Sequence, residues 1–244
     1  MMKQIPNLLT LANLACGILA IMAVFEGKPV QASWLMLLAA GFDFLDGFAA
    51  RLLKANSPLG VQLDSLADLV TFGVAPGFIM QYLAVSNGYC SAEGFCINGY
   101  IFLAIPLFSA YRLAKFNIDE RQTAGFLGVP TPANALLIAS FPFIVEAQGL
   151  LEPVVTHFRF VTLFPVISAY LLVSELPLMA FKFKSFNLRA QPFHYTFLLL
   201  IVAGVAIQGW QAVPWIFLAY LLLSALDAWF TRRSETEPHS NGTT

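Results

Sequence analysis

Two neighbouring stretches decide the fold of this chain, because each places two acidic side chains within an apolar run. Residues 41–51 read GFDFLDGFAAR, and residues 60–68 read GVQLDSLAD. Asp43 and Asp46 are spaced i, i+3, which puts both on one face of a helix. Asp64 and Asp68 are spaced i, i+4, again on one face of the next helix. A break at residues 56–58 makes these helices antiparallel neighbours whose carboxylate faces can meet.

The composition places those helices in a membrane. The chain has 244 residues, of which 58% are hydrophobic and only 11% are charged, whereas soluble domains average about 25% charged residues. The mean hydropathy is +0.73. These values exclude a disordered, collagenous or ordinary soluble protein. The 13 Lys and Arg residues are too few and too scattered for a nucleic-acid-binding surface, so no nucleic acid is expected as a partner.

The expected architecture is an all-α, polytopic membrane helix bundle. A helix needs roughly 20 mostly apolar residues to cross a bilayer. Eight runs meet this requirement, at residues 7–25, 30–54, 60–84, 98–117, 131–147, 158–181, 193–209 and 212–231. We expect Pro142, Pro165 and Pro177 to kink their helices, which packed membrane helices tolerate. A single transmembrane domain is predicted at 1–233, with a disordered polar tail at 234–244.

The basic residues predict the orientation of the bundle, since cytoplasmic loops carry an excess of Lys and Arg. With eight spans, eleven basic residues fall on one side, and only Lys28 and Arg159 fall on the other. Both termini are therefore predicted to be cytoplasmic. The four acids then lie in the cytoplasmic halves of their spans.

Two further polar features remain outside this pattern. Cys90 and Cys96 lie in the loop 86–99, on the predicted outer side, where an oxidising environment permits a disulfide. The sequence is compatible with a disulfide between Cys90 and Cys96 and equally with two free thiols. Glu175 is expected to pair with a Lys or Arg across helices.

The four carboxylates point to metal binding. Each costs about 2.5–3.5 kcal/mol inside a span, so such residues usually mark function. Four of them cannot all stay ionised in an apolar setting without cations. Hard divalent ions suit these oxygen ligands, which favours Mg²⁺ or Mn²⁺, with Ca²⁺ as a further option. Two such ions are the usual clamp for a displacement at phosphorus. The alternative is a set of helix-end acids paired with Arg51 and Lys54.

The residues between the two acidic pairs suit a bulky anionic group. Gly47 and Ala50 leave room for a nucleotide to approach the backbone. Arg51 offers a forked cation for phosphate.

The whole pattern resembles the signature of the CDP-alcohol phosphotransferase family, Asp-x₂-Asp-Gly-x₂-Ala-Arg-x₈-Gly-x₃-Asp-x₃-Asp. The residues that match it are Asp43, Asp46, Gly47, Ala50, Arg51, Gly60, Asp64 and Asp68. The resemblance implies transfer of a phosphatidyl-type group from a CDP-linked lipid to an alcohol, with release of CMP. It also implies an integral membrane protein, of the bacterial inner membrane, that works as a homodimer with its active site facing the cytoplasm.

The same resemblance implies roles for individual residues. All four acids would bind the two metal ions, and Asp68 would also take the proton of the acceptor hydroxyl. The residues implied in binding the CDP-lipid are Asn7, Thr10, Gly47, Ala50, Arg51, Ser57 and Gly60.

Further segments are similar to the phosphatidylserine synthase subgroup of that family. They are residues 5–17, 63–76, 111–117 and 126–133. This similarity implies CDP-diacylglycerol and L-serine as substrates, with Arg112, Lys115 and Asn117 at the acceptor site. Lys115 stands where the subgroup usually has Arg and lacks the planar fork that binds a carboxylate. Positive-inside anchoring is the alternative for both cations.

Other functions remain to be weighed against this one. Glycerol 3-phosphate or inositol phosphate would be the acceptor in a sister reaction. An aromatic prenyltransferase also uses Asp-rich motifs with Mg²⁺, but on well-separated helices. A cation transporter would use the four carboxylates as an ion site, for which a position at the membrane midplane is typical.

Overall fold

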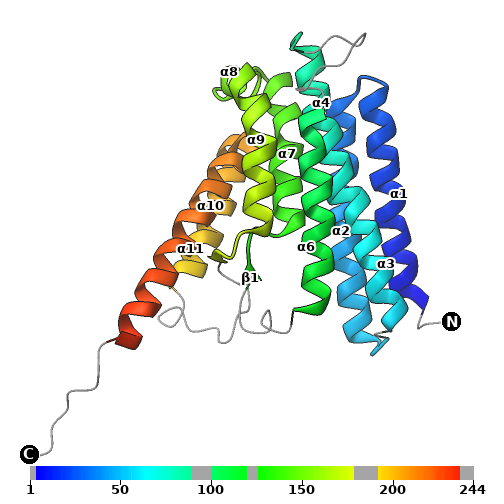
Figure 1. Cartoon of the computed structure of the whole chain (residues 1–244), viewed down its shortest axis with the longest axis vertical. Helices are drawn as coiled ribbons and strands as arrows, with labels where there is room; N and C mark the ends of the chain where they lie inside the picture. The colour runs from blue at the N-terminus through cyan, green and yellow to red at the C-terminus, as the bar shows by residue number, and fades with distance from the viewer. Residues whose placement is uncertain (1–3, 56, 90–99, 120–125, 179–191, 237–244) are drawn as a thin grey trace, which may run out of the picture.

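The structure is a computed structural model that describes residues 4–55, 57–89, 100–119, 126–178 and 192–236. Nearly all of these residues are helical (Figure 1). The N-terminal part contains α1 (Ile5–Phe25), α2 (Pro29–Leu52), α3 (Pro58–Asp68), the π-helical segment η2 (Leu69–Val74) and α4 (Ala75–Ser86). α3, η2 and α4 form one continuous helix, Pro58–Ser86.

The C-terminal part adds five longer helices and a short antiparallel pair of strands. Its elements are η3 (Ile101–Leu103), α6 (Ala104–Ile118), β1 (Phe126–Leu127), α7 (Thr131–Glu146), α8 (Glu152–Val155), α9 (Phe158–Val173), β2 (Pro177–Leu178), α10 (Pro192–Gln208), η5 (Gly209–Ala212) and α11 (Val213–Thr236). α11 leans away from the bundle at the end where α1 begins (Figure 1).

The turn between α2 and α3 is set by local sequence. α2 ends at Leu52, and Lys54 adopts a left-handed conformation with φ of 48°. Pro58 begins α3, because its fixed φ suits the first helical position. The Ser57 side chain caps α3 by accepting a hydrogen bond from the Gly60 N–H at 3.0 Å. The expected break between the two acidic helices is therefore confirmed.

The core lies where α1, α2, α4 and α7 pack together. Fully buried side chains there include Ala20, Ala32, Met36, Ile79 and Ile138. Small residues dominate the α1–α2 contact, which lets these helices approach closely, as is common in membrane bundles.

Four helical segments of the described chain are long and apolar enough to cross a membrane. They are Ile5–Phe25, Pro58–Ser86, Ile101–Ile118 and Leu199–Leu226. α7 and α9 are apolar but shorter. Large apolar side chains also cover the outer surface, where Leu8, Phe44 and Leu107 are each more than 60% exposed. Such a surface suits lipid and not water, so the protein is a helical membrane protein.

The segment Leu199–Leu226 is two helices and not one. η5 interrupts it, and Gly209 has a positive φ of 57°. A Cβ added at Gly204 would lie 3.3 Å from the Ile216 side chain, which places α10 and α11 side by side after a reversal of the chain.

The predicted span 158–181 is wrong in its last part. α9 ends at Val173, and Ser174 is extended, with ψ of 149°. Leu178 then pairs with Phe126 in an antiparallel bridge. Pro177 lies in β2 and does not kink a helix, because it begins this short strand. Pro142 and Pro165 do lie inside α7 and α9.

The chain end and the cysteine loop bear on two other predictions. α11 extends to Thr236, so residues 234–236 belong to a helix and not to the predicted tail. Residues 237–244, Cys90 and Cys96 lie outside the described residues.

Candidate functional site

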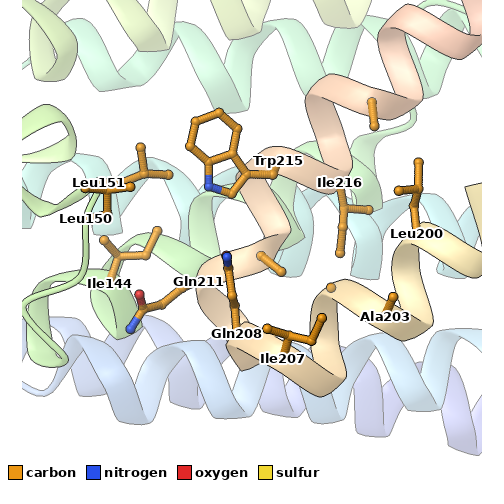
Figure 2. Close-up of a pocket in the computed structure, with 13 residues that line it drawn as sticks. Ile144, Leu150, Leu151, Leu200, Ala203, Ile207, Gln208, Gln211, Trp215 and Ile216 are labelled. Atoms are coloured by element: carbon orange, nitrogen blue, oxygen red, sulfur yellow. The ribbon is translucent and has the colours of Figure 1, made fainter.

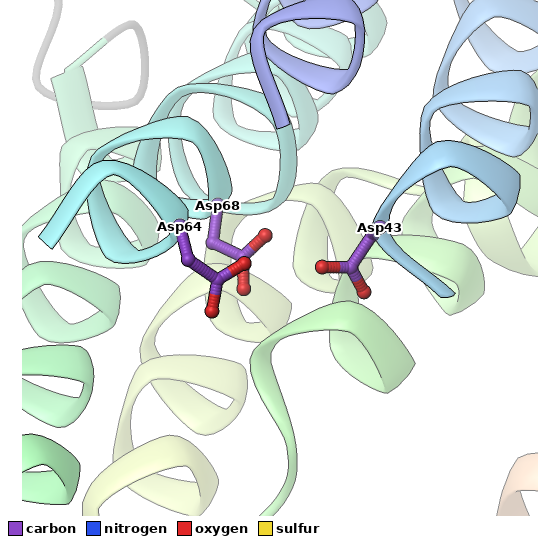
Figure 3. A group of neighbouring side chains, drawn as sticks. All are labelled: Asp43, Asp64 and Asp68. Carbon is purple, nitrogen blue, oxygen red and sulfur yellow. The ribbon is translucent and has the colours of Figure 1, made fainter. Parts of the chain in front are cut away.

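Three carboxylates converge between α2 and α3. One oxygen each from Asp43, Asp64 and Asp68 lies within 4.8 Å of the others. Figure 3 shows Asp43 reaching across from α2 toward the two acids of α3. Asp43 and Asp64 are half-buried, and Asp68 is 8% exposed. The expected facing of the two acidic helices is thus present, and it concentrates negative charge in a partly desolvated space.

Asp46 lies beside this group and has its own partner. Its side chain is 6% exposed, and its Oδ2 accepts a hydrogen bond from the Thr10 hydroxyl at 2.6 Å. It also repels Asp43 and Asp64 electrostatically, so it belongs to the same charged centre. Among the described residues, three of the four acids thus form the cluster of neighbouring carboxylates. The fourth, Asp46, is hydrogen-bonded to Thr10 of α1.

Asp68 has a partner that the motif does not contain. The Asn13 amide Nδ2 donates to Asp68 Oδ1 at 3.2 Å, and Asn13 is fully buried. A polar residue three positions after Thr10 in an apolar span was the available signal for this contact. The π-helical segment η2 begins directly after Asp68, and such segments often occur at functional sites.

A cavity of about 310 Å³ opens beside the carboxylates, between α1, α2 and the start of α3. All seven residues predicted to bind the CDP-lipid line it, together with two of the acids. The lining residues are Pro6, Asn7, Thr10, Asp46, Gly47, Ala50, Arg51, Ala55, Ser57, Gly60, Val61 and Asp64. Residues up to 58 positions apart in the sequence therefore share one wall beside the charged centre.

The glycines of this cavity have different roles. A Cβ added at Gly47 would meet no described atom within 4 Å, so the backbone there is open to a ligand. A Cβ added at Gly60 would lie 3.2 Å from Ser57 Oγ and 3.3 Å from Asn7 Oδ1, so Gly60 allows close packing. The exposed Arg51 donates from Nε to the Gly47 carbonyl at 3.0 Å, and its side chain lines the cavity.

Arg112 lies inside the bundle and close to the acids. It is 8% exposed, and it interacts electrostatically with Asp68. Its Nη1 donates to the Thr131 hydroxyl at 3.1 Å, while its Nε has no hydrogen-bond partner among the described residues. A buried guanidinium with an unpaired donor is costly unless a ligand supplies the acceptor. Thr131, at the start of α7, was not predicted as a site residue.

The other two acceptor candidates have partners of their own. Lys115 forms an ion pair with Glu175 at 3.4 Å, which confirms that Glu175 pairs with a basic residue, although Glu175 lies in the extended segment after α9 and not in a helix. Asn117 is exposed and donates to Ser65 Oγ at 2.8 Å. Lys115 lines a small cleft together with Arg112, whereas Asn117 joins the end of α6 to α3.

The donor set around Asp43, Asp64 and Asp68 fits a divalent cation. Carboxylate oxygens are the ligands that Mg²⁺ and Mn²⁺ prefer, and their close approach needs a positive charge between them. Asp46 can add a further oxygen from the same face of α2.

A larger cavity, of about 640 Å³, lies away from the acids (Figure 2). It is formed where α7 ends and where α10 turns into α11. Its lining includes Ile144, Leu151, Leu200, Ile207, Gln208, Gln211 and Trp215, with no charged side chain. Its described lining therefore offers no acidic or basic side chain for catalysis.

Comparisons with known proteins give one family and several similar enzymes. The family model described as CDP-alcohol phosphatidyltransferase matches residues 3–181. A CDP-diacylglycerol--serine O-phosphatidyltransferase of Helicobacter pylori is 30% identical over 226 residues, which cover 92% of this chain and 90% of that protein. The enzyme of the same description from Bacillus subtilis is 36% identical over 148 residues, covering 58% of this chain and 78% of its own.

An archaeal relative is also similar. An archaetidylserine synthase of Methanothermobacter thermautotrophicus is 36% identical over 139 residues, which cover 56% of this chain and 57% of that protein.

Proposed function

This chain belongs to the CDP-alcohol phosphatidyltransferase family, and from that premise we propose that it transfers a phosphatidyl group from CDP-diacylglycerol to L-serine. The products would be phosphatidylserine and CMP. The observation that carries the proposal is the cluster of three carboxylates beside a cavity that is lined by residues of the family's signature. The serine acceptor rests on the relatives named for that reaction.

The four acids would hold two divalent cations, Mg²⁺ or Mn²⁺. Asp43, Asp64 and Asp68 would provide the shared centre, and Asp46 the additional ligand. Bound cations would neutralise the pyrophosphate and stabilise CMP as it leaves.

The protein's own residues would bind the donor and move the proton. Arg51 would pair with phosphate oxygens at the mouth of the cavity, and the open backbone at Gly47 would admit the nucleotide. The serine hydroxyl oxygen would bond to the phosphorus that carries diacylglycerol. The bond from this phosphorus to CMP would break, and CMP would leave with the electron pair. Asp68 would accept the hydroxyl proton.

Arg112 would hold the carboxylate of serine. It is buried, it lies near Asp68 and its Nε lacks a partner among the described residues. A carboxylate accepts two parallel hydrogen bonds from a guanidinium, which would orient the serine hydroxyl toward Asp68. Lys115 and Asn117 would contribute at the rim, after leaving the partners they have here.

The membrane arrangement belongs to the same proposal. The described chain has eight long helical segments when α3, η2 and α4 are counted as one, and each would be a span. Both termini and the acids would then face the cytoplasm, in the inner membrane of a bacterium. The protein would form a homodimer in contact with membrane lipids. The transmembrane domain would cover residues 1–233, and its last helix, α11, continues beyond that range to Thr236.

A substrate-exchange assay tests the function. Purified protein with CDP-diacylglycerol and Mn²⁺ receives labelled serine, glycerol 3-phosphate or inositol phosphate in separate reactions. Among the three acceptors, we expect only serine to give lipid product and equimolar CMP, and the Asp68→Asn variant should form both far more slowly. Product only with a phosphorylated acceptor would identify the sister reaction instead. Ion flux into liposomes without CMP release would identify a transporter.

A further inference from the structure

One face of α1 joins the two acidic helices, although α1 carries no acid itself. Thr10, Asn13 and Gly17 follow one another at i, i+3 and i+7, and all three are buried. The family signature does not include Asn13 or Gly17. Buried polar groups in a membrane bundle need partners, so the partners of these residues reveal what the face does.

The first two residues each bind a different acidic helix. Thr10 donates to Asp46 Oδ2 on α2 at 2.6 Å. Asn13 donates to Asp68 Oδ1 on α3 at 3.2 Å. The Thr10 hydroxyl also lies 3.0 Å from the Pro6 carbonyl, but an ionised carboxylate is the stronger acceptor of its single proton. One turn of α1 therefore contacts one carboxylate from each acidic pair.

The third residue keeps α1 close to the π-helical segment. A Cβ at Gly17 would collide with Thr71 Oγ1 and would lie 2.9 Å from Thr71 Cα. The Thr71 hydroxyl donates to the Asn13 carbonyl oxygen at 3.2 Å, so η2 contacts the backbone that carries the Asn13 amide. This close approach packs α1 against η2 beside the contact between Asn13 and Asp68.

We infer that Thr10 and Asn13 are positioning residues that fix Asp46 and Asp68 for metal binding, with α1 setting the register of α2 against α3. The metal-binding role in this inference rests on the proposed function. The contacts of Thr10 and Asn13 with the two acids are observed independently of it. Hydrogen bonds to the carboxylates that hold a metal orient those ligands, and losing one typically costs about 10–100-fold in metal affinity or activity.

Mn²⁺ affinity of the purified full chain in detergent, without nucleotide or serine, gives the decisive readout. Thr10→Val removes the hydroxyl and keeps the shape, whereas Thr10→Ser keeps the donor. We expect about 10–100-fold weaker Mn²⁺ binding for Thr10→Val and near wild-type binding for Thr10→Ser. Thr71→Val is the matched control, since it also removes a buried hydroxyl, but one that donates to a backbone carbonyl. It should lower the thermal midpoint and leave Mn²⁺ affinity intact.

Asn13→Leu extends the test to the second acid. We expect kcat to fall about 10–100-fold, with KM for CDP-diacylglycerol unchanged and Mn²⁺ affinity reduced. The inference is overturned if Thr10→Val and Asn13→Leu bind Mn²⁺ as wild type does. A raised KM for CDP-diacylglycerol alone in Thr10→Val would overturn it too, and would make Thr10 a nucleotide contact only. If wild type binds Mn²⁺ and the variants do not, but serine is never a substrate, the inference stands and the proposed function fails.

Discussion

Asp43 is the one acid that α2 contributes to the cluster of Asp43, Asp64 and Asp68. Without its charge, the carboxylates of this cluster would come from α3 alone. We expect Asp43→Asn to bring turnover below detection and to weaken Mn²⁺ binding, because a neutral amide is a poor ligand for a hard cation. Glu26→Gln is the control, since Glu26 is an exposed acid paired with Lys28 outside the site. Retained turnover in Asp43→Asn would refute the ligand role.

Asp68 is proposed to be both a ligand and the base, and these roles can be separated. We expect Asp68→Asn to lower kcat about 10²–10⁴-fold, the usual contribution of general base catalysis. Binding of CDP-diacylglycerol should persist, because the nucleotide cavity is lined by other residues. Isothermal titration with CDP-diacylglycerol in detergent measures this. Loss of donor binding together with turnover would mean that Asp68 acts chiefly as a ligand.

Arg112 tests the acceptor site. We expect Arg112→Lys to raise KM for serine about 10–100-fold, because Lys keeps the charge but loses the fork and the unpaired Nε donor. KM for CDP-diacylglycerol should change little. Lys115→Arg is the comparison, since Lys115 is partly exposed and paired with Glu175. Equal KM values for serine in wild type and Arg112→Lys would remove Arg112 from the acceptor site.

The residues were easier to predict from the sequence than their partners. Spacing alone placed Asp43 and Asp46 on one face and Asp64 and Asp68 on another, and the helix break made these faces meet. Asn13 was missed as a site residue because its spacing from Thr10 places both on one face of a helix but does not reveal which helix that face contacts. Its contact with Asp68 joins residues 55 positions apart, and only the packing of α1 against α3 brings them together.

At the scale of elements, the sequence located the helices well but not their internal irregularities. Apolar length predicted α1 and the continuous helix Pro58–Ser86 within two residues at each end. It did not predict η2, because a π-helical segment has the same apolar composition as the α-helix around it. It also extended the sixth span too far, since hydropathy cannot distinguish a short strand from the end of a helix.

The close contact between α1 and η2 yields a prediction about elements. We expect Gly17→Ala to destabilise the protein by about 1–3 kcal/mol, as overpacking usually does, because its Cβ would meet Thr71. Gly41→Ala on α2 is the matched control, since a Cβ there would meet no described atom within 4 Å. This control should be neutral or slightly stabilising, as Ala favours helix over Gly. Thermal unfolding in detergent compares them, and an equal midpoint for both variants would contradict the close packing.

For the molecule as a whole, the positions of the charged residues favour one orientation in the membrane. Asp43 and Asp46 lie in the second half of α2, and Asp64 and Asp68 in the first half of Pro58–Ser86. Both pairs are therefore nearer to the end of the bundle where α1 begins and α11 ends (Figure 1). That end also carries Arg51 and Lys54, and the positive-inside rule predicts that a face with such residues is cytoplasmic. A site near this end of the bundle suits the polar head group of a CDP-linked lipid and a water-soluble amino acid better than it suits an ion path at the midplane.

This orientation can be measured with single cysteines placed at opposite ends. Lys54 is exposed at the turn after α2, and Leu150 is 85% exposed at the turn after α7. In a background where Cys90 and Cys96 are serine, we expect a membrane-impermeant maleimide to label Leu150→Cys in intact cells. Lys54→Cys should be labelled only after the membrane is opened, because it would face the cytoplasm. The buried Cys16 should stay unlabelled in both and serves as the internal control. Labelling of Lys54→Cys from outside would invert the topology and place the carboxylates on the wrong side for a cytoplasmic CDP-linked substrate.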